Sequence, residues 1–289
     1  MIDKALLRSL DDYFELCIRE DIGAADYSTE ACIPSAARGR SVLIAKESGI
    51  VAGLPLAEYL LKKFDAEAQL HYLKTDGQRV EEGDKLFEAE GRIRAILSSE
   101  RLILNFIQRL SGIATRTAEY VAIASKYGVR VADTRKTTPG MRLLEKAAVR
   151  AGGGMNHRMG LYDMIMIKDN HADFAGGISK AVAAVERFLD EKGLALKIEV
   201  ETRNPEEVRE ALKSGRVDVI MLDNFKPDEI REAVALIDGR AEIEASGNIT
   251  YENLEAYAST GIDYLSTGAL THSVRSLDMS LCALFDSPR

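Results

Sequence analysis

Basic side chains gather in residues 130–172, where two short apolar runs stop. The first run ends in Asp133-Thr134-Arg135-Lys136 and the second in Lys168-Asp169-Asn170-His171, with Gly152-Gly153-Gly154 and Asn156-His157-Arg158 between them. The stretch holds eight Lys or Arg and four Asp or Glu, a net +4, so the rest of the −8 chain carries −12. Lys and Arg are most often solvated surface residues. Their position at strand ends and beside glycines favours instead one pocket that receives a polyanion, since Arg suits bidentate binding of carboxylate and phosphate.

Two carboxylates farther along the chain, Glu201 and Asp223, each close an apolar run. We expect them to hold Mg²⁺, directly or through water, together with ribose hydroxyls, because Mg²⁺ takes few protein carboxylates when it also binds phosphates. A structural ion pair with Lys136 or Lys168 is the alternative, and the two readings are compatible. Glu199 should face the same side as Glu201 if that strand is regular.

Two glycine-containing loops follow the last two apolar runs, Ser246-Gly247-Asn248 and Thr267-Gly268-Ala269. Glycine lets the backbone approach an anion closely, and barrel enzymes often bind phosphate through backbone amides at the last two strands. Either loop alone would most often be a plain turn. Their occurrence as a pair favours a phosphate site.

The elements that must position these residues alternate between strand and helix after residue 128. We expect helices at Gly177–Glu191, Pro205–Lys213 and Pro227–Ile237, the second starting with proline in its first position. Such alternation predicts a parallel sheet whose strand ends share one rim, in a barrel or in an open doubly wound sheet. Apolar strands are expected at residues 129–132, 164–167, 195–200, 217–222, 241–245 and 262–266.

The pattern of expected strands and helices in residues 1–95 indicates a sheet with helices on one side. No residues in this part are suited to catalysis. A long helix is expected from a cap at Ser98 to Tyr127, with Gly128 at its end. Arg101 would lie in its first turn, an unusual place for a cation. The other expected elements are a helix over residues 1–20 ended by Gly23, a strand pair within 39–53, a helix over 55–64, and strands at 67–74, 79–81 and 85–90.

Composition narrows the class of protein. The 289 residues are 46% hydrophobic and 29% charged, as in a soluble globular protein with one large or two medium domains. No apolar run is long enough for a membrane span, and the N-terminus lacks an apolar signal core. Cys17, Cys32 and Cys282 have no metal or redox spacing, which favours reduced thiols in a cytoplasm. No basic stripe with interleaved aromatic residues indicates a nucleic-acid surface.

The central motif DTRKTTPGMRLLEKAAVRAGGGMNHRMGLYDMIMIKDNH resembles the quinolinate phosphoribosyltransferases, and so do SERLILNFIQRLSGIAT, IEVET, IMLDNF, IEASGNI and DYLSTGALTHS. The resemblance covers essentially the whole chain. It implies an α/β fold in which an incomplete, about seven-stranded α/β barrel (residues 113–272) follows an N-terminal open-faced α/β sandwich (residues 1–112). The C-terminal tail, residues 273–289, would pack with the sandwich.

The resemblance also implies a reaction and its residues. Quinolinate and phosphoribosyl pyrophosphate would give nicotinate mononucleotide, pyrophosphate and carbon dioxide, with Mg²⁺ as cofactor, in a homodimer or higher homo-oligomer with shared sites. Lys136, Glu201 and Asp223 would be catalytic, and the family match ranks Glu199 below Glu201. The substrate-binding set would be Arg101 from a neighbouring subunit, Thr134, Arg135, Lys136, His157, Arg158, Lys168, Glu201, Asp223, Ser246, Gly247, Asn248, Thr267, Gly268, Ala269 and His272.

Three alternatives stay open at this level. A molybdenum-transport-associated paralogue shares the fold, but the intact Asn156-His157-Arg158 and Lys168-Asp169-Asn170 argue against it. A non-catalytic anion-binding barrel would be favoured by missing acids, yet Glu201 and Asp223 are present. A phosphate-binding aldolase would need a Schiff-base lysine, for which Lys168 is placed.

Overall fold

The computed structural model describes residues 2–285, which form two compact units. Unit 1 comprises the residues up to Ala118, Thr138–Gly153 and the residues from Ser273 onward, and unit 2 comprises Glu119–Thr137 and Gly154–His272. Helix α5 (Ile93–Ala124) runs from one unit into the other, and the predicted domain boundary at residue 112 falls inside it. None of the helices described between residues 2 and 285 is long and apolar enough to cross a membrane.

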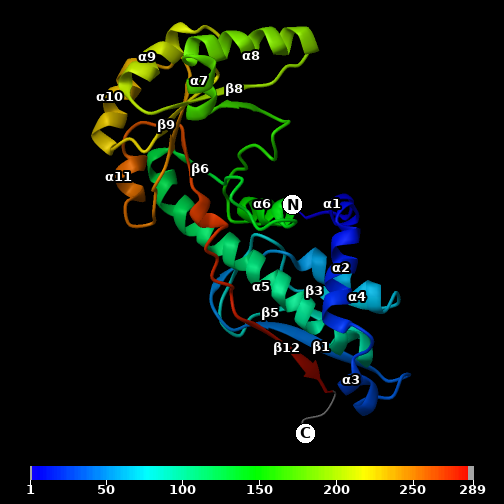
Figure 1. Ribbon diagram of the computed structural model, residues 1–289. Helices are drawn as coiled ribbons and strands as arrows, with labels where there is room; N and C mark the ends of the chain where they lie inside the picture. Colours follow the sequence, from blue (N-terminus) through cyan, green and yellow to red (C-terminus); the bar gives the residue numbers. More distant parts are fainter. Residues whose placement is uncertain (1, 286–289) are drawn as a thin grey trace. The chain divides into compact units, whose positions relative to one another are not determined.

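Unit 1 contains a four-stranded antiparallel sheet in the order β12-β1-β5-β3. Figure 1 shows β12, near the C-terminus, beside β1 from the first fifth of the chain, with Val42 opposite Cys282. The expected strand pair within residues 39–53 is wrong, because β2 pairs with β4 in a separate two-stranded sheet. The strands are β1 (Arg38–Ala45), β2 (Gly49–Ile50), β3 (Gln69–Tyr72), β4 (Arg79–Val80), β5 (Lys85–Arg92) and β12 (Met279–Leu284).

The first helix expected in unit 1 is broken in the structure. The predicted helix over residues 1–20 is two helices, because Leu10 leaves the helical region at φ −107° and ψ 11°. Gly23, at φ 59°, ends the second of them as expected. The bounds are α1 (Lys4–Ser9), α2 (Asp11–Ile22), α3 (Tyr27–Cys32), α4 (Leu54–Phe64) and α6 (Arg142–Ala151).

Helix α5 begins at Ile93, five residues before the expected cap at Ser98. The Ser98 hydroxyl donates instead to Asp26 Oδ2, 2.8 Å away, so it ties the helix to the α3 segment. Arg101 therefore lies on the exposed face of the helix interior, and the argument from a cation in the first turn is wrong. The helix ends near the predicted position, in a 3₁₀ turn (Ser125–Tyr127) followed by Gly128 in the left-handed region at φ 72°.

Unit 2 is built on a parallel six-stranded sheet in the order β6-β11-β10-β9-β8-β7. An isolated parallel bridge between Ala132 and Met155 extends it beyond β6. All six strands overlap the expected apolar runs, with bounds that differ by up to three residues, and with the bridge they bear out the expected incomplete, about seven-stranded barrel. The strands are β6 (Arg130–Ala132), β7 (Ile165–Ile167), β8 (Ile198–Thr202), β9 (Val219–Asp223), β10 (Glu242–Ser246) and β11 (Tyr264–Ser266).

Helices α8, α9 and α10 follow one another along the strands of unit 2 (Figure 1). Their starts are set locally: Asn204 Oδ1 accepts the Glu207 amide at 2.9 Å, and Pro205 takes the first helical position. Because each helix returns the chain to the same end of the sheet, every strand leaves its carboxyl end at one rim. The helices are α7 (Asp169–Ala175), α8 (Ile178–Lys192), α9 (Pro205–Lys213), α10 (Pro227–Ile237) and α11 (Leu254–Ala258), with a 3₁₀ turn at Gly268–Leu270.

Candidate active site

A cavity of about 520 Å³ lies at the carboxyl ends of the strands of unit 2. Cationic, acidic and glycine-containing segments all reach it, although they come from different strands. Sequence reasoning placed these segments on one rim, and the cavity brings most of them together. Its lining includes the predicted residues Thr134, Arg135, Lys136, His157, Arg158, Lys168, Glu201, Asp223, Ser246, Gly247 and Asn248.

The remaining predicted residues of unit 2, Thr267, Gly268, Ala269 and His272, are not among the residues that line the cavity. A Cβ at Gly268 would come within 2.8 Å of both Lys136 Cδ and His272 Cδ2, so this glycine leaves room for the Lys136 side chain. The Thr267 hydroxyl accepts the Ala269 amide at 3.2 Å and shapes the turn. The segment therefore supports Lys136 from below, and Arg101 belongs to the other unit.

The cationic side of the cavity is formed by Arg135 and Arg158. Arg135 Nε is buried and has no hydrogen-bond partner among the described residues. Burial, and then the nearby Arg135, lower the pKa of Arg158 from its usual value. Two guanidinium groups held close together, one with an unused buried donor, form a site for an anion with more than one acidic group.

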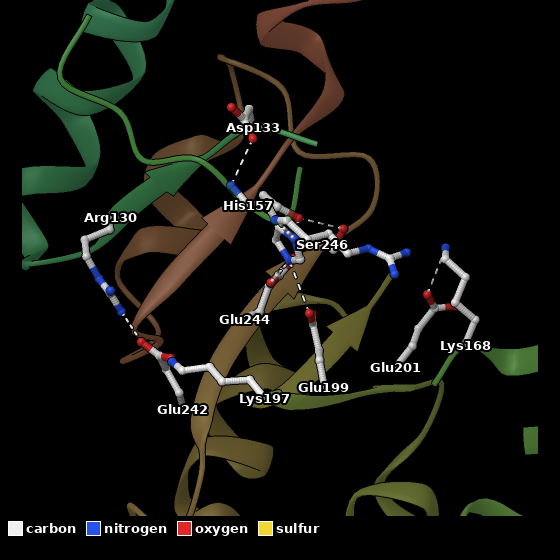
Figure 2. Close-up of polar contacts among 12 residues, drawn as sticks. Arg130, Asp133, His157, Lys168, Lys197, Glu199, Glu201, Glu242, Glu244 and Ser246 are labelled. Carbon is white, nitrogen blue, oxygen red and sulfur yellow. Dashed lines mark hydrogen bonds and ion pairs between the residues drawn. The ribbon is translucent and has the colours of Figure 1, made fainter. Parts of the chain in front are cut away.

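The acidic side is formed by Glu201 from β8 and Asp223 from β9. Lys168 Nζ lies 3.4 Å from Glu201 Oε2 (Figure 2), as the ion-pair reading expected. Burial, and then the charge of Glu201, raise the pKa of Asp223. Two carboxylates that repel each other in the lining of one cavity fit a divalent cation, whose charge would relieve the repulsion.

A buried group of three side chains, which we call the His157 cluster, lies at the floor of the cavity and consists of His157, Glu199 and Glu244, the first and last of which line it. His157 Nε2 is 3.0 Å from Glu244 Oε2 and 3.2 Å from Glu199 Oε2, and both glutamates are fully buried (Figure 2). The Ser266 hydroxyl also donates to Glu244. Burial alone would lower the pKa of His157, but the carboxylates of Glu199 and Glu244 beside Nε2 outweigh burial and raise the pKa to about 10.

The second ring nitrogen of His157, Nδ1, also has a partner within the protein. Nδ1 accepts the Arg158 backbone amide at 2.8 Å, so in this geometry the ring proton is on Nε2, facing the glutamates. The raised pKa favours a second ring proton, but Nδ1 can take it only if the Arg158 hydrogen bond breaks, so the two glutamates and this backbone amide compete for the protonation state of the ring. A metal ion at Nε2 would require the same break, although the three ligand atoms lie within 4.8 Å of one another. The geometry therefore favours a hydrogen-bonded cluster over a metal centre.

Asp133 fixes the segment that carries this histidine. Its side chain is buried, and it accepts the His157 backbone amide at 2.9 Å and the Asn156 side-chain amide at 2.5 Å. Sequence reasoning did not assign Asp133 or Glu244 a role. Glu244 could have been found by alternation, because it stands two residues before Ser246 on the same strand and so faces the same side. For Asp133 the sequence offers no comparable signal, since the partners lie 23 and 24 residues away.

Comparison with known proteins places these features in one family. A family model for the quinolinate phosphoribosyl transferase C-terminal domain matches residues 113–282, and one for the N-terminal domain matches residues 26–111. The probable nicotinate-nucleotide pyrophosphorylase (carboxylating) of Bacillus subtilis is 44% identical over 275 residues, covering 95% of this chain and 92% of that protein. Quinolinate phosphoribosyltransferase (decarboxylating) 2, mitochondrial, of Nicotiana glauca is 43% identical over 287 residues, covering 94% and 81%.

Solved structures agree with the sequence relatives. The crystal structure of NadC from Streptococcus pyogenes superposes with a TM-score of 0.90 at 42% identity, covering 96% of this chain and 98% of that one. The nicotinate-nucleotide pyrophosphorylase from Francisella tularensis gives a TM-score of 0.90 at 38% identity, covering 95% and 96%.

Proposed function

The chain belongs to the quinolinate phosphoribosyltransferase family, and we propose that its cavity transfers a phosphoribosyl group from phosphoribosyl pyrophosphate to quinolinate with loss of carbon dioxide. The chain is thus an enzyme of the pentosyltransferase class, nicotinate-nucleotide pyrophosphorylase (carboxylating), which serves NAD biosynthesis. The observation that carries the proposal is that a cationic side and an acidic side line the same cavity. Arg135 and Arg158 offer donors for two carboxylates, and Glu201 and Asp223 lie among phosphate-loop residues.

Quinolinate would lie against the cationic side. Its two carboxylates would take the guanidinium groups of Arg135 and Arg158, with Lys168 at the rim. His157 uses both ring nitrogens within the protein, so it would not bind the carboxylates of quinolinate directly. Held in this way, the pyridine nitrogen could be aimed at C1 of the ribose, and positioning would supply much of the rate enhancement.

The phosphoribosyl donor would lie across the acidic side and the loop Ser246-Gly247-Asn248. We propose that Glu201 and Asp223 hold Mg²⁺, directly or through water, and the ribose hydroxyls. When bound, the cation would neutralise charge on the pyrophosphate. Lys136, supported by the turn at Gly268, would bind the leaving pyrophosphate and stabilise its charge.

The order of the bond changes follows from the positive charge that develops on the pyridine nitrogen. The ribose C1–O bond to pyrophosphate breaks as the bond from the ring nitrogen to C1 forms, which leaves a cationic pyridinium. That positive nitrogen stabilises the electron pair left on C2 when its carboxylate departs as carbon dioxide, and a proton at C2 completes nicotinate mononucleotide. The side chains orient both substrates and stabilise charge, and none needs to form a covalent bond.

The other readings of the sequence fit this cavity less well. A Schiff-base lysine needs a desolvated amine, yet the Lys168 side chain is 48% exposed and pairs with Glu201. A purely anion-binding barrel would have no use for the pair of Glu201 and Asp223. The molybdenum-associated paralogue is disfavoured by Asn156-His157-Arg158, whose first two residues hydrogen-bond to buried Asp133.

We propose further that the enzyme is a homodimer or a higher homo-oligomer, in which exposed Arg101 of each subunit completes the quinolinate pocket of its neighbour. A two-fold interface would let each subunit lend and receive one arginine. We also propose a cytoplasmic location, for which the free cysteines Cys17, Cys32 and Cys282 are the supporting observation.

The direct test mixes the purified chain with quinolinate, phosphoribosyl pyrophosphate and Mg²⁺. We expect nicotinate mononucleotide, pyrophosphate and carbon dioxide in equal amounts, detected by chromatography and by release of label from the 2-carboxylate. Chelation of the cation should stop product formation, and its return should restore it. Absence of the mononucleotide with a folded protein and fresh donor would contradict the proposed function.

A further inference from the structure

Asn224 lies at the point where the acidic side of the cavity meets the phosphate loop. Strands β9 and β10 pair in parallel with Asp223 directly opposite Ser246, and the next amide, Asn224 N–H, donates to the Ser246 carbonyl at 2.9 Å. The ladder thus continues one residue beyond Asp223. This places the Asn224 side chain between Asp223 and the loop formed by Gly247 and Asn248.

The Asn224 carboxamide bonds in both directions. Its Nδ2 donates to Asp223 Oδ2 at 2.6 Å, and its Oδ1 accepts from Asn248 Nδ2 at 3.0 Å. A carboxylate only accepts hydrogen bonds, so the amide nitrogen must face Asp223 and the amide oxygen must face Asn248. The chain of donors is therefore ordered from Asn248 through Asn224 to Asp223.

The backbone conformation adapts to this bridge. Asn224 and Asn248 have φ 60° and φ 52°, in the left-handed region that asparagine tolerates better than most residues. Gly247 has φ 90°, and a Cβ there would lie 2.3 Å from Asn224 Oδ1. A side chain at position 247 would therefore push into the bridge.

We propose that Asn224 is a positioning residue that fixes the Asp223 carboxylate relative to the phosphate loop, and that it thereby sets the affinity for the phosphoribosyl donor. The inference rests on the proposed function, because it assigns the donor to Asp223 and to the loop Ser246-Gly247-Asn248. Asn224 acts through these neighbours, as outer hydrogen-bond partners do at other anion and cation sites. Quinolinate, held by the two arginines, does not depend on it.

Two variants distinguish the effect of the Asn224 carboxamide from the effect of its left-handed backbone conformation. Asn224→Gly keeps the left-handed conformation accessible and removes the bridge. Asn224→Asp keeps the shape and tolerates the same conformation, but it cannot donate to Asp223 and places a like charge beside it. Both should raise the KM for phosphoribosyl pyrophosphate about tenfold or more, while the KM for quinolinate stays within about twofold. Calorimetric binding of each substrate alone should show the same split.

A cycle with Asn248→Gly tests the ordered bridge. Once Asn224 is glycine, loss of the Asn248 side chain should raise the donor KM by less than it does in the wild type, because the shared hydrogen bond is already gone. Thermal unfolding of each variant checks the fold. Three results would each overturn the inference. The KM for phosphoribosyl pyrophosphate could be unchanged in Asn224→Asp, the KM values for both substrates could rise equally, or the effects of the Asn224 and Asn248 variants on the donor KM could simply multiply. A wild-type protein that forms no mononucleotide would instead overturn the proposed function.

Discussion

Glu199 Oε2 lies 3.2 Å from His157 Nε2, although both side chains are almost completely removed from solvent. Glu244 occupies the other side of the same nitrogen at 3.0 Å, so one ring proton faces two carboxylates. Burial, and then repulsion by Glu244, raise the pKa of Glu199 to about 7, while His157 opposes the rise. The floor of the cavity therefore holds a carboxyl group whose pKa is raised by burial and by a neighbouring like charge.

The titration of Glu199 should appear in the stability of the protein. A carboxyl group whose folded-state pKa is raised from 4.5 to about 7 contributes stability that is fully present below 4.5 and is lost as the pH rises through 7. Glu199→Gln removes this carboxyl group. Between about pH 5 and pH 8 the free energy of unfolding of the variant should therefore fall less than that of the wild type, and the difference between the two falls should be on the order of 1–3 kcal/mol. Urea unfolding at both pH values measures this. Glu206→Gln, at a side chain 79% exposed, should behave as wild type, and equal pH dependence in all three proteins would refute the assignment.

Substrate choice should depend on both carboxylates. Arg135 and Arg158 line the same cavity, and a site built for two charged groups is left with unpaired charge when one is missing. Nicotinate, which lacks the 2-carboxylate, should therefore have a kcat/KM far below that of quinolinate. Comparable turnover of the two acids in steady-state assays would rule out this role for the arginines.

Either arginine should be dispensable for folding but not for activity. Arg135→Ala or Arg158→Ala should cost about 2–4 kcal/mol of substrate or transition-state stabilisation, as expected for a charged hydrogen-bonding partner. The buried Arg135 Nε has no partner among the described residues, so its removal orphans no acceptor on that side. Kinetics for both substrates and thermal unfolding give the two readouts. Unfolding of Arg135→Ala at wild-type working temperature would show that the residue is structural.

The shared pocket can be tested by mixing two inactive variants, Arg101→Ala and Lys168→Ala. In a hybrid dimer one pocket would carry both lesions and the other neither, if Arg101 acts across a two-fold interface. Activity should return after subunit exchange and approach about one quarter of wild type when mixing is random and equal. Native mass spectrometry verifies the exchange. Verified hybrids without activity would show that Arg101 does not cross the interface.

Chelation should weaken donor binding more than quinolinate binding. Glu201 and Asp223 lie among the phosphate-loop residues and apart from the two arginines in the proposed arrangement, so removal of Mg²⁺ should mainly affect phosphoribosyl pyrophosphate. Calorimetry with and without a chelator measures both affinities. Asp223→Asn should reproduce the effect of chelation, whereas an unchanged donor affinity in both cases would refute the proposed Mg²⁺ site.

Much of unit 2 could be predicted from the sequence because its signals are local. Each apolar run stops at a polar residue, Asn204-Pro205 starts a helix, and alternation along a strand puts Glu199 and Glu201 on one side. In an alternating α/β chain the carboxyl ends of parallel strands must share a rim. The sequence alone therefore placed Arg135, Lys168, Glu201 and Asp223 near one cavity.

Features that depend on distant pairing were decided only by the tertiary structure. The sequence could not show that β1 pairs with β12, or that Ser98 bonds to Asp26 instead of capping α5, because these partners are far apart in the chain and carry no periodic signal. The same reason hid the contact of Asp133 with His157, 24 residues away, and alternation could have placed Glu244 on the cavity side of its strand but not against His157, 87 residues away. Asn224 joins Asn248 only because β9 and β10 pair in one register. Local patterns thus set which residues end each strand, and long-range packing set which of them touch.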